Sequence, residues 1–332
     1  WLTGKDKKMN WEKEWVWVKG PESPRNFYVY FRGWFESGEG VKKVLVHLTA
    51  DSRYLLYLNG EFQGRGPAKC DPKYQYYDTY NVTKKVTAGR NLIAVLVHHY
   101  GEETFSYLLG RGGFLCQSEV IYNDGHKKVY GTDSSWRTKS AEAWDQNASR
   151  TTVQLGFQEI YDAKKEPVGW QKPDFDDTSW DTPVLLGKPL KKTVGVGFIR
   201  PETGSINRTP TIPWENLIPR DIPFLKESAL LPQRVVEIGE IAGSNVGQGF
   251  SLALDNLNLA GLLENELHLP WNKEGIKGLK NLLRQNDRYL EISVPENGLY
   301  LILDFGKEVT GFPNFTLETE EDGGMVDLAY DE

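Results

Sequence analysis

The sequence is poor in cysteine, histidine and methionine, with 2, 5 and 2 residues among 332. Cys70 and Cys116 permit at most one disulfide, and neither stands in a spacing typical of metal ligands. Whether these two cysteines are bonded stays open. The sequence also contains no Gly-x-Ser-x-Gly elbow. The residues therefore give no support to a serine-nucleophile triad.

Long apolar runs and basic clusters are missing as well. No run approaches the roughly 18 to 20 apolar residues that cross a bilayer. The formal net charge is −7, whereas a surface that binds phosphate groups is basic. We therefore expect no membrane span and no nucleic-acid partner. No signal peptide is visible, but the sequence starts at Trp1 without a methionine, so removal of a leader by processing stays open.

Helical periodicity is scarce. Only residues 275–284 read as a helix, with Ile276, Leu279, Leu282 and Leu283 on one face. In contrast, strand-like runs recur about every ten residues. This spacing favours a β-sandwich or jelly roll over an α/β fold.

Aromatic residues are abundant, with 11 Trp, 16 Tyr and 14 Phe. Such residues pack well on sheets, which is the simpler interpretation of each of them. They also stack on the apolar C–H faces of sugar rings. Both roles remain open at this point.

The stretch from Val44 to Gly101 contains the clearest strand signals. The runs 44–49, 54–58 and 92–100 are rich in β-branched and aromatic residues. Asn59-Gly60 predicts a two-residue type I′ turn, which needs positive φ at both positions. We expect these segments to form one antiparallel sheet at the centre of the fold.

Proline marks a change in organisation between residues 201 and 232, which contain six prolines. Proline removes backbone donors and fixes φ, so this segment is predicted to be an extended linker lying over the first domain. The sequence thus predicts an all-β chain, with an N-terminal jelly-roll module at 1–200, a linker at 201–232 and a second β-sandwich at 233–332. The second sandwich is expected to use strands at 233–239, 289–294, 298–305, 315–319 and 325–330.

Asp174, Asp176 and Asp177 are the candidate ligands for a metal, because Ca²⁺ prefers carboxylate oxygens. They lack the spacing of an EF-hand loop, and neighbouring aspartates more commonly fix tight turns. Calcium is therefore a possible ligand, and no other cofactor is expected. The histidines are poor candidates: His98 and His99 point to opposite faces of a strand, and His47, His126 and His268 are isolated.

Paired carboxylates are the requirement for inverting glycoside hydrolysis. Glu102-Glu103 is the leading candidate pair, and Glu159, Asp162 and Glu166 follow. No pair has a spacing that separates it from ordinary surface charge, so we expect no catalysis by this chain alone. Residues 110–113 form a glycine-rich turn between strands, which predicts no nucleotide site.

Four sequons, at Asn81, Asn147, Asn207 and Asn314, are potential glycan acceptors in a secretory pathway. Chance alone yields some sequons in a chain rich in asparagine. They therefore do not establish the compartment.

Several longer motifs occur in a distinctive order. They are Tyr57-Leu58-Asn59-Gly60, Tyr77-Asp78-Thr79-Tyr80-Asn81-Val82-Thr83, Gly89-Arg90-Asn91-Leu92, Thr132-Asp133-Ser134-Ser135-Trp136, Tyr161-Asp162-Ala163 and Phe175-Asp176-Asp177-Thr178-Ser179-Trp180. In this order they resemble the N-terminal β-sandwich module, of jelly-roll and galactose-binding-like type, of bacterial α-L-rhamnosidases of glycoside hydrolase family 78. Residues 214–223 resemble the linker of that family, and residues 303–312 resemble a strand of its second sandwich.

The resemblance implies that catalysis belongs to a following (α/α)6 barrel, for which the sequence has no room. We expect a fragment with accessory function, whose partners are that barrel and a rhamnose-containing oligosaccharide. A periplasmic or secreted location is implied. The alternative is a free-standing carbohydrate-binding or interaction protein, since related modules bind rhamnose with calcium; the ligands of that calcium cannot be matched here residue by residue.

Overall fold

The structure is a computed structural model that describes residues 9–70, 74–104, 107, 109–150, 156–189, 213–214, 216–240, 276–284, 288–294, 298–319, 324–326 and 328. The chain divides into two compact units, Trp1–Pro223 and Phe224–Glu332. This division falls within the predicted linker. The limits of 200 and 232 that the sequence suggests stay predictions.

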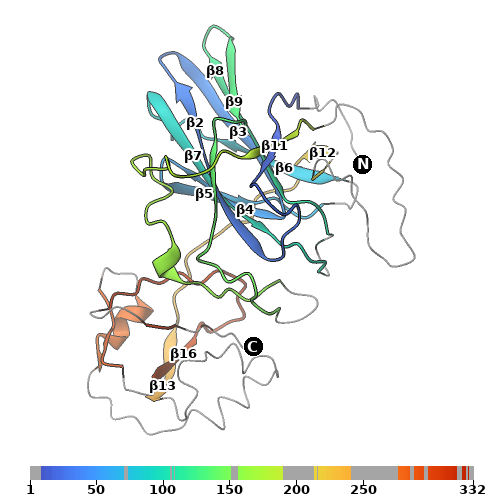
Figure 1. Cartoon of the computed structure of the whole chain (residues 1–332). Coiled ribbons are helices and arrows are strands. Elements are labelled where there is room, and N and C mark those ends of the chain that lie inside the picture. Colours follow the sequence, from blue (N-terminus) through green and yellow to red (C-terminus); the bar gives the residue numbers. More distant parts are fainter. Residues whose placement is uncertain are drawn as a thin grey trace. The chain divides into compact units, whose positions relative to one another are not determined.

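The first unit is a sandwich of two β-sheets (Figure 1). The larger sheet has the order β11-β1-β8-β3-β6-β12, with β9 paired to β8. Its strands are β1 (Trp15–Trp17), β3 (Val41–Asp51), β6 (Gln75–Asn81), β8 (Gly113–Tyr122), β9 (Lys127–Gly131), β11 (Val184–Gly187) and β12 (Leu217–Pro219). Every pair in this sheet is antiparallel except β6–β12, which is parallel.

The smaller sheet has the order β10-β2-β7-β4-β5 and is antiparallel throughout. Its strands are β2 (Phe27–Ser37), β4 (Arg53–Leu58), β5 (Glu61–Gly66), β7 (Gly89–His99) and β10 (Arg137–Ser140). Asn59 and Gly60 have φ of 51° and 91°. These positive values confirm the predicted hairpin between β4 and β5.

The expectation of one central sheet is wrong, because β3 belongs to the larger sheet whereas β4 and β7 belong to the smaller one. The three strands share a hydrophobic core rather than a hydrogen-bond ladder. Residues that alternate along them face each other across the sandwich, for example Leu48, Leu56 and Val95. Alternation shows which face of a strand is buried but not which strand pairs with it.

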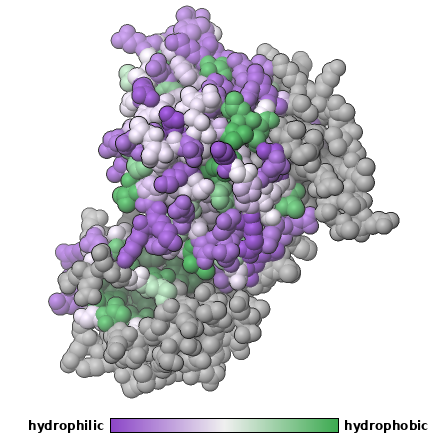
Figure 2. Space-filling view, in the orientation of Figure 1, coloured by the Kyte–Doolittle hydropathy of each residue, from purple (hydrophilic) through white to green (hydrophobic). Residues whose placement is uncertain are grey.

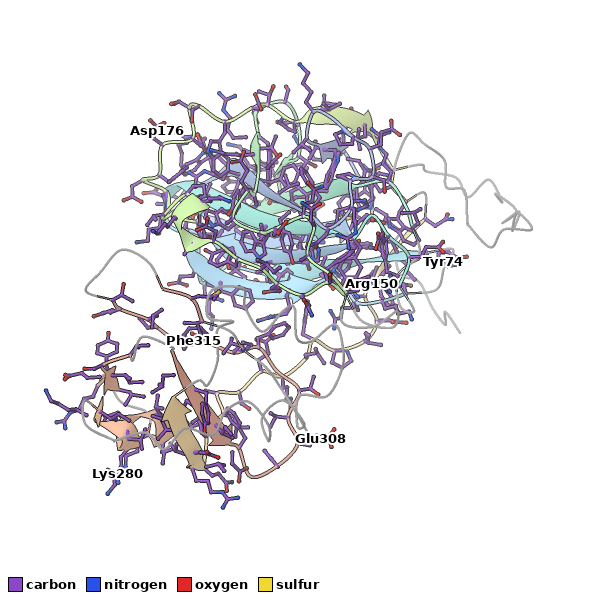
Figure 3. The ribbon with its side chains drawn as sticks, turned by 60° about the horizontal axis from the view of Figure 1, so that its bottom comes forward. Tyr74, Arg150, Asp176, Lys280, Glu308 and Phe315 are labelled. Carbon is purple, nitrogen blue, oxygen red and sulfur yellow. The ribbon has the colours of Figure 1, made fainter. Side chains whose placement is uncertain are left out.

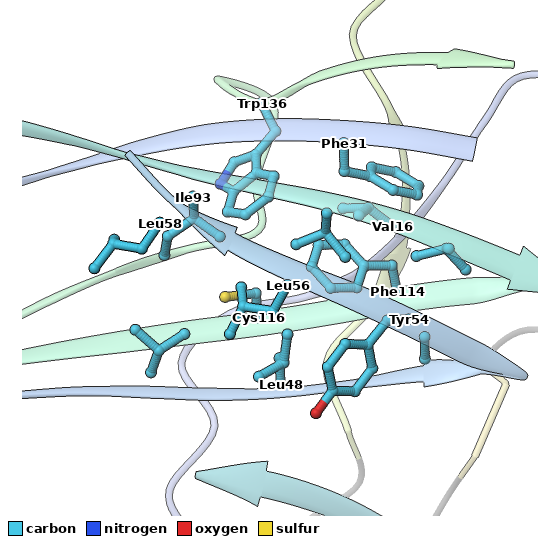
Figure 4. Packing of buried hydrophobic residues seen from close by; sticks show 14 of the residues in the cluster. Val16, Phe31, Leu48, Tyr54, Leu56, Leu58, Ile93, Phe114, Cys116 and Trp136 are labelled. Carbon is cyan, nitrogen blue, oxygen red and sulfur yellow. The ribbon is translucent and has the colours of Figure 1, made fainter. Parts of the chain in front are cut away.

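The core between the sheets consists of side chains from both inner faces (Figure 4). Leu56, Phe114 and Trp136 are almost fully buried there. Trp136 follows the Asp133 turn and lies over Gly33 of β2, where a Cβ would come within 2.0 Å of the indole ring. Only glycine leaves room for this packing.

The smaller sheet is apolar on its outer face too. Tyr28 and Tyr30 of β2 and Leu92 of β7 pack there against Trp170 and Trp180. Residues 141–150 and 156–181, which we call the cover segment, run over this face and contain the short 3-10 helix η1 (Ala163–Lys165). The cover segment explains why β7 is buried on both faces.

In the second unit, the described strands form two separate antiparallel pairs. They are β13 (Arg234–Glu240) with β16 (Leu299–Asp304), and β14 (Ile276–Lys277) with β15 (Glu291–Ile292). The predicted strands at 233–239 and 298–305 are thus confirmed. Residues 315–319 have no regular structure, so that predicted strand is wrong, and part of 325–330 lies outside the described residues.

The predicted helix at 275–284 is wrong at its start. Ile276 and Lys277 are in β14, and Gly278 has a left-handed φ of 79°. Only Leu279–Leu283 coils, as the 3-10 helix η4. Glycine takes this conformation without the steric cost that other residues meet, so the chain turns at Gly278 instead of continuing a helix. Gly275 lies outside the described residues.

On the face of the first unit that Figure 2 presents, hydrophilic residues predominate and hydrophobic ones form small separate groups. Among the described residues, no helix is long and apolar enough to span a membrane.

Candidate functional site

Glu102 and Glu103 follow the end of β7 and lie in a loop. Glu102 Oε1 accepts a hydrogen bond of 2.8 Å from Arg25 Nε, and its Oε2 lies 3.9 Å from Arg150 Nη1. Arg150 also donates to the backbone oxygen of Glu103. Glu102 is therefore the bridge between two arginines, which is a structural role rather than that of one acid in a catalytic pair.

The carboxylates of the cover segment have local partners as well. Asp162 caps η1 by accepting from Lys164 N, and Glu166 accepts from the Trp170 indole at 3.0 Å. Desolvation raises the pKa of Glu166, and it raises the pKa of Glu159. A raised pKa is one property of a general acid, but none of these residues is paired with a second carboxylate.

The candidate calcium ligands separate in the structure. Asp176 Oδ1 accepts from Thr178 N and closes a turn, whereas Asp177 Oδ2 pairs with Arg32 Nε at 2.7 Å. In Figure 3, Asp176 lies well apart from Arg150, so the aspartates do not share a site with the Glu102 bridge. Within the described ranges, no group of three His, Cys, Asp or Glu residues is arranged to hold a metal ion.

Arg32 is a structural residue that sequence reasoning missed, although a charge inside an aromatic strand was a visible signal. Its side chain is fully buried on the outer face of β2. The guanidinium binds Asp177 and the backbone oxygens of Trp170, Lys172 and Phe175. The motif 175–180 is thus fastened to the sheet by one arginine.

Asp51 is a second missed residue, at the end of β3. Its Oδ1 atom lies 3.0 Å from His99 Nδ1 and accepts from the Tyr107 hydroxyl, and its Oδ2 atom accepts from the Trp214 indole at 2.9 Å. Since β3 and the β7 residue His99 belong to different sheets, Asp51 links the two sheets at one end of the sandwich.

Ser23 completes a chain of hydrogen bonds in the order of a serine-hydrolase triad. Its Oγ atom lies 3.0 Å from His99 Nε2 and 2.8 Å from the oxygen of Gly110. In this geometry the Ser23 hydroxyl donates to the Gly110 carbonyl, whereas the proton of a nucleophilic serine goes to the histidine. Ser23, His99 and Asp51 thus connect the segment before β2 with β7 and β3.

The remaining histidines are likewise separated. His98 of the smaller sheet stacks on Tyr28 with ring centroids 3.9 Å apart. His47 of β3 contacts Thr79 of β6, and both of these strands belong to the larger sheet. His126 lies at an exposed hairpin tip beside Asp124, and His268 lies outside the described residues.

Cys70 and Cys116 are not joined by a disulfide. Gly110–Gly113 lead into β8, as predicted, rather than into a helix.

A shallow depression lies between β2 and the start of the cover segment, which follows β10. It is lined by Asn26, Phe27, Tyr28, Ser140, Ala141, Glu142, Trp144 and Gln146. The ring of Trp144 stacks on Tyr28 and also contacts Tyr30 and Tyr161. Tyr28 therefore covers one face of the indole, and Tyr30 and Tyr161 contact it at tilted angles.

These features define a β-sandwich module in which the notable polar residues fasten segments of the chain to one another. Comparisons with known proteins show what this module resembles. Residues 39–196 match the family model described as the alpha-L-rhamnosidase N-terminal domain. The match covers a little less than half of the chain.

An alpha-L-rhamnosidase of Streptomyces avermitilis is 32% identical over 158 residues, which are 42% of this chain and 14% of that protein. Another, from an Alteromonas species, is 26% identical over 195 residues, or 52% of this chain and 20% of that protein. The chain thus spans a fifth or less of the length of these relatives.

The crystal structure of a GH78 family rhamnosidase of Bacillus sp. GL1 superimposes with a TM-score of 0.61 and 37% sequence identity. The match covers 72% of this chain and 23% of that one. The match therefore extends well beyond the residues of the N-terminal domain.

Proposed function

We propose that this chain is a non-catalytic accessory region of an α-L-rhamnosidase-like glycoside hydrolase that cleaves terminal rhamnose from plant or bacterial glycans. The observation that carries the proposal is the match of 72% of this chain to 23% of the Bacillus sp. GL1 rhamnosidase. The structural partners of Glu102, Asp162 and Glu166 support a role without chemistry.

In this proposal the partner is a helical catalytic barrel in the same polypeptide, and the substrate of the whole enzyme is a rhamnose-containing oligosaccharide. The second unit would be the β-sandwich that precedes the barrel. Export to the periplasm or the medium is the location that degradation of external glycans favours.

The test is an assay of the purified chain on an aryl α-L-rhamnoside, beside calorimetric titration with L-rhamnose, with and without Ca²⁺. We expect neither turnover nor saturable heat. Turnover would contradict the proposal, because the bond would then be cut by residues of this chain. Saturable binding without turnover would instead favour a carbohydrate-binding protein, and a requirement for Ca²⁺ would indicate a metal-dependent sugar site.

A further inference from the structure

Residues 213–214 and 216–223, which we call the strap, follow the sandwich in the sequence and lie along the edge of β6. Its central strand β12 pairs in parallel with β6, Leu217 opposite Gln75. Gln75 N donates to the oxygen of Asn216, and Arg220 N donates to the oxygen of Tyr77. The strap thus covers backbone groups that an edge strand otherwise exposes.

Two buried carboxylates of the sandwich bind side chains of the strap. Asp51 accepts from the Trp214 indole, and Asp78 Oδ1 accepts from Arg220 Nη1 at 3.3 Å. Both aspartates are 0% exposed. Asp78 also accepts from the Tyr54 hydroxyl, which lies 3.2 Å from the Tyr80 hydroxyl. Without the strap, each carboxylate loses one of its hydrogen-bond donors, which is costly for a charged group buried in the fold.

The geometry of the strap is adapted to this edge. Pro213 packs against Gly113 of β8, where a Cβ would lie 2.2 Å from the proline Cγ. Arg220 also donates to the backbone oxygens of Ile222 and Pro223, and the Tyr76 hydroxyl donates to Asp221 at 2.6 Å. The guanidinium therefore shapes the last turn of the strap as well as binding Asp78.

We propose that the edge of β6, with Asp51 and Asp78, is a recognition surface whose occupant is the chain's own strap. The strap docks as a unit through an indole and a guanidinium six residues apart. The segment after the family domain is then a fixed attachment rather than a flexible spacer. This inference does not depend on the proposed function.

Hydrogen exchange of the full chain, read by mass spectrometry, tests the proposal. In the wild type, residues 214–221 should be protected. Arg220→Ala should speed exchange about tenfold or more both there and in residues 74–78, because local opening of the strap releases both strands together. Trp214→Phe, which retains a ring and loses one hydrogen bond, should act on the same residues more weakly.

Arg234→Ala is the matched control, since it removes an arginine from the exposed pair with Asp304 in the second unit and should leave both segments unchanged. Exchange of residues 214–221 at the rate of unstructured chain in the wild type would overturn the proposal. An effect of Arg220→Ala on 214–221 without one on 74–78 would overturn it too. If Arg220→Ala also speeds exchange in β7, the sandwich has unfolded. Trp214→Phe is then the deciding variant, and an effect on 214–221 without one on 74–78 would overturn the proposal.

Discussion

His47 lies in β3 with 7% of its surface exposed, and its Nδ1 atom is 2.9 Å from the Thr79 hydroxyl. Its Nε2 atom is buried without a hydrogen-bond partner. Burial lowers the pKa of His47 to about 4, against the smaller opposing effect of Glu119. The site therefore holds a neutral imidazole and resists its protonation.

We expect acid to destabilise the sandwich through this residue. Because the folded pKa of about 4 lies below the unfolded value of 6.5, the unfolded state binds the proton more readily. The stabilisation is complete above pH 6.5 and is lost as the pH falls towards 4, by about 3 kcal/mol. Denaturant unfolding between pH 7 and 4 measures this loss.

His47→Gln should reduce this pH dependence, while His126→Gln, a change at the exposed hairpin tip, should not. Some dependence should persist, because burial also lowers the pKa of His98 to about 3. Equal slopes for wild type and His47→Gln would contradict the assignment.

At the scale of elements, the described part of the cover segment contains little regular secondary structure, and side chains fasten it to the sheet. Trp170 and Trp180 supply the apolar contacts with β2, and Arg32 supplies the polar ones. The guanidinium lies 5.1 Å from the Phe175 ring centre. The buried guanidinium of Arg32 thus binds three backbone oxygens and one carboxylate of the cover segment.

Arg32→Met should therefore lower the free energy of unfolding by about 3 kcal/mol, because it leaves Asp177 and three carbonyls without their donor. Denaturant unfolding measures the change, and faster hydrogen exchange at 170–177 should accompany it. Arg90→Met is the control on the neighbouring strand, where the cation lies over Trp34 at 4.3 Å and is exposed; about 1 kcal/mol or less is expected. Similar losses for both variants would contradict the fastening role of Arg32.

At the scale of the whole molecule, the two cysteines differ in how far the folded chain buries them. Cys116 lies in β8 within the core, and burial raises the pKa of its thiol, whereas Cys70 is half-buried in a loop. A thiol reacts as the thiolate, and it needs access to the reagent. Cys116 should therefore react only when the sandwich unfolds.

A disulfide reagent should label one thiol per chain under native conditions and two in denaturant. Cys116→Ser should retain the native labelling and lose the additional thiol. Rapid labelling of two thiols in the native state would contradict the burial of Cys116. If no thiol is labelled in denaturant without reductant, this would contradict the finding that the two cysteines are not joined by a disulfide.

Much of the first unit could be predicted from sequence because its signals are local. Runs of β-branched and aromatic residues marked β3, β4 and β7, and Asn59-Gly60 marked a hairpin whose backbone needs positive φ. The motif words and their order pointed to the rhamnosidase N-terminal domain.

Tertiary structure decided the rest, since it depends on residues far apart in the sequence. It assigned β3 and β4 to different sheets, and it brought Arg32 to Asp177 and Arg220 to Asp78 across more than a hundred residues. Charge, spacing and periodicity do not specify such partners, because the partners are chosen by whichever distant segment buries the charge and satisfies its hydrogen bonds. For the same reason Glu102, which the sequence left as a candidate acid, became a bridge between arginines once Arg25 and Arg150 met it in the fold.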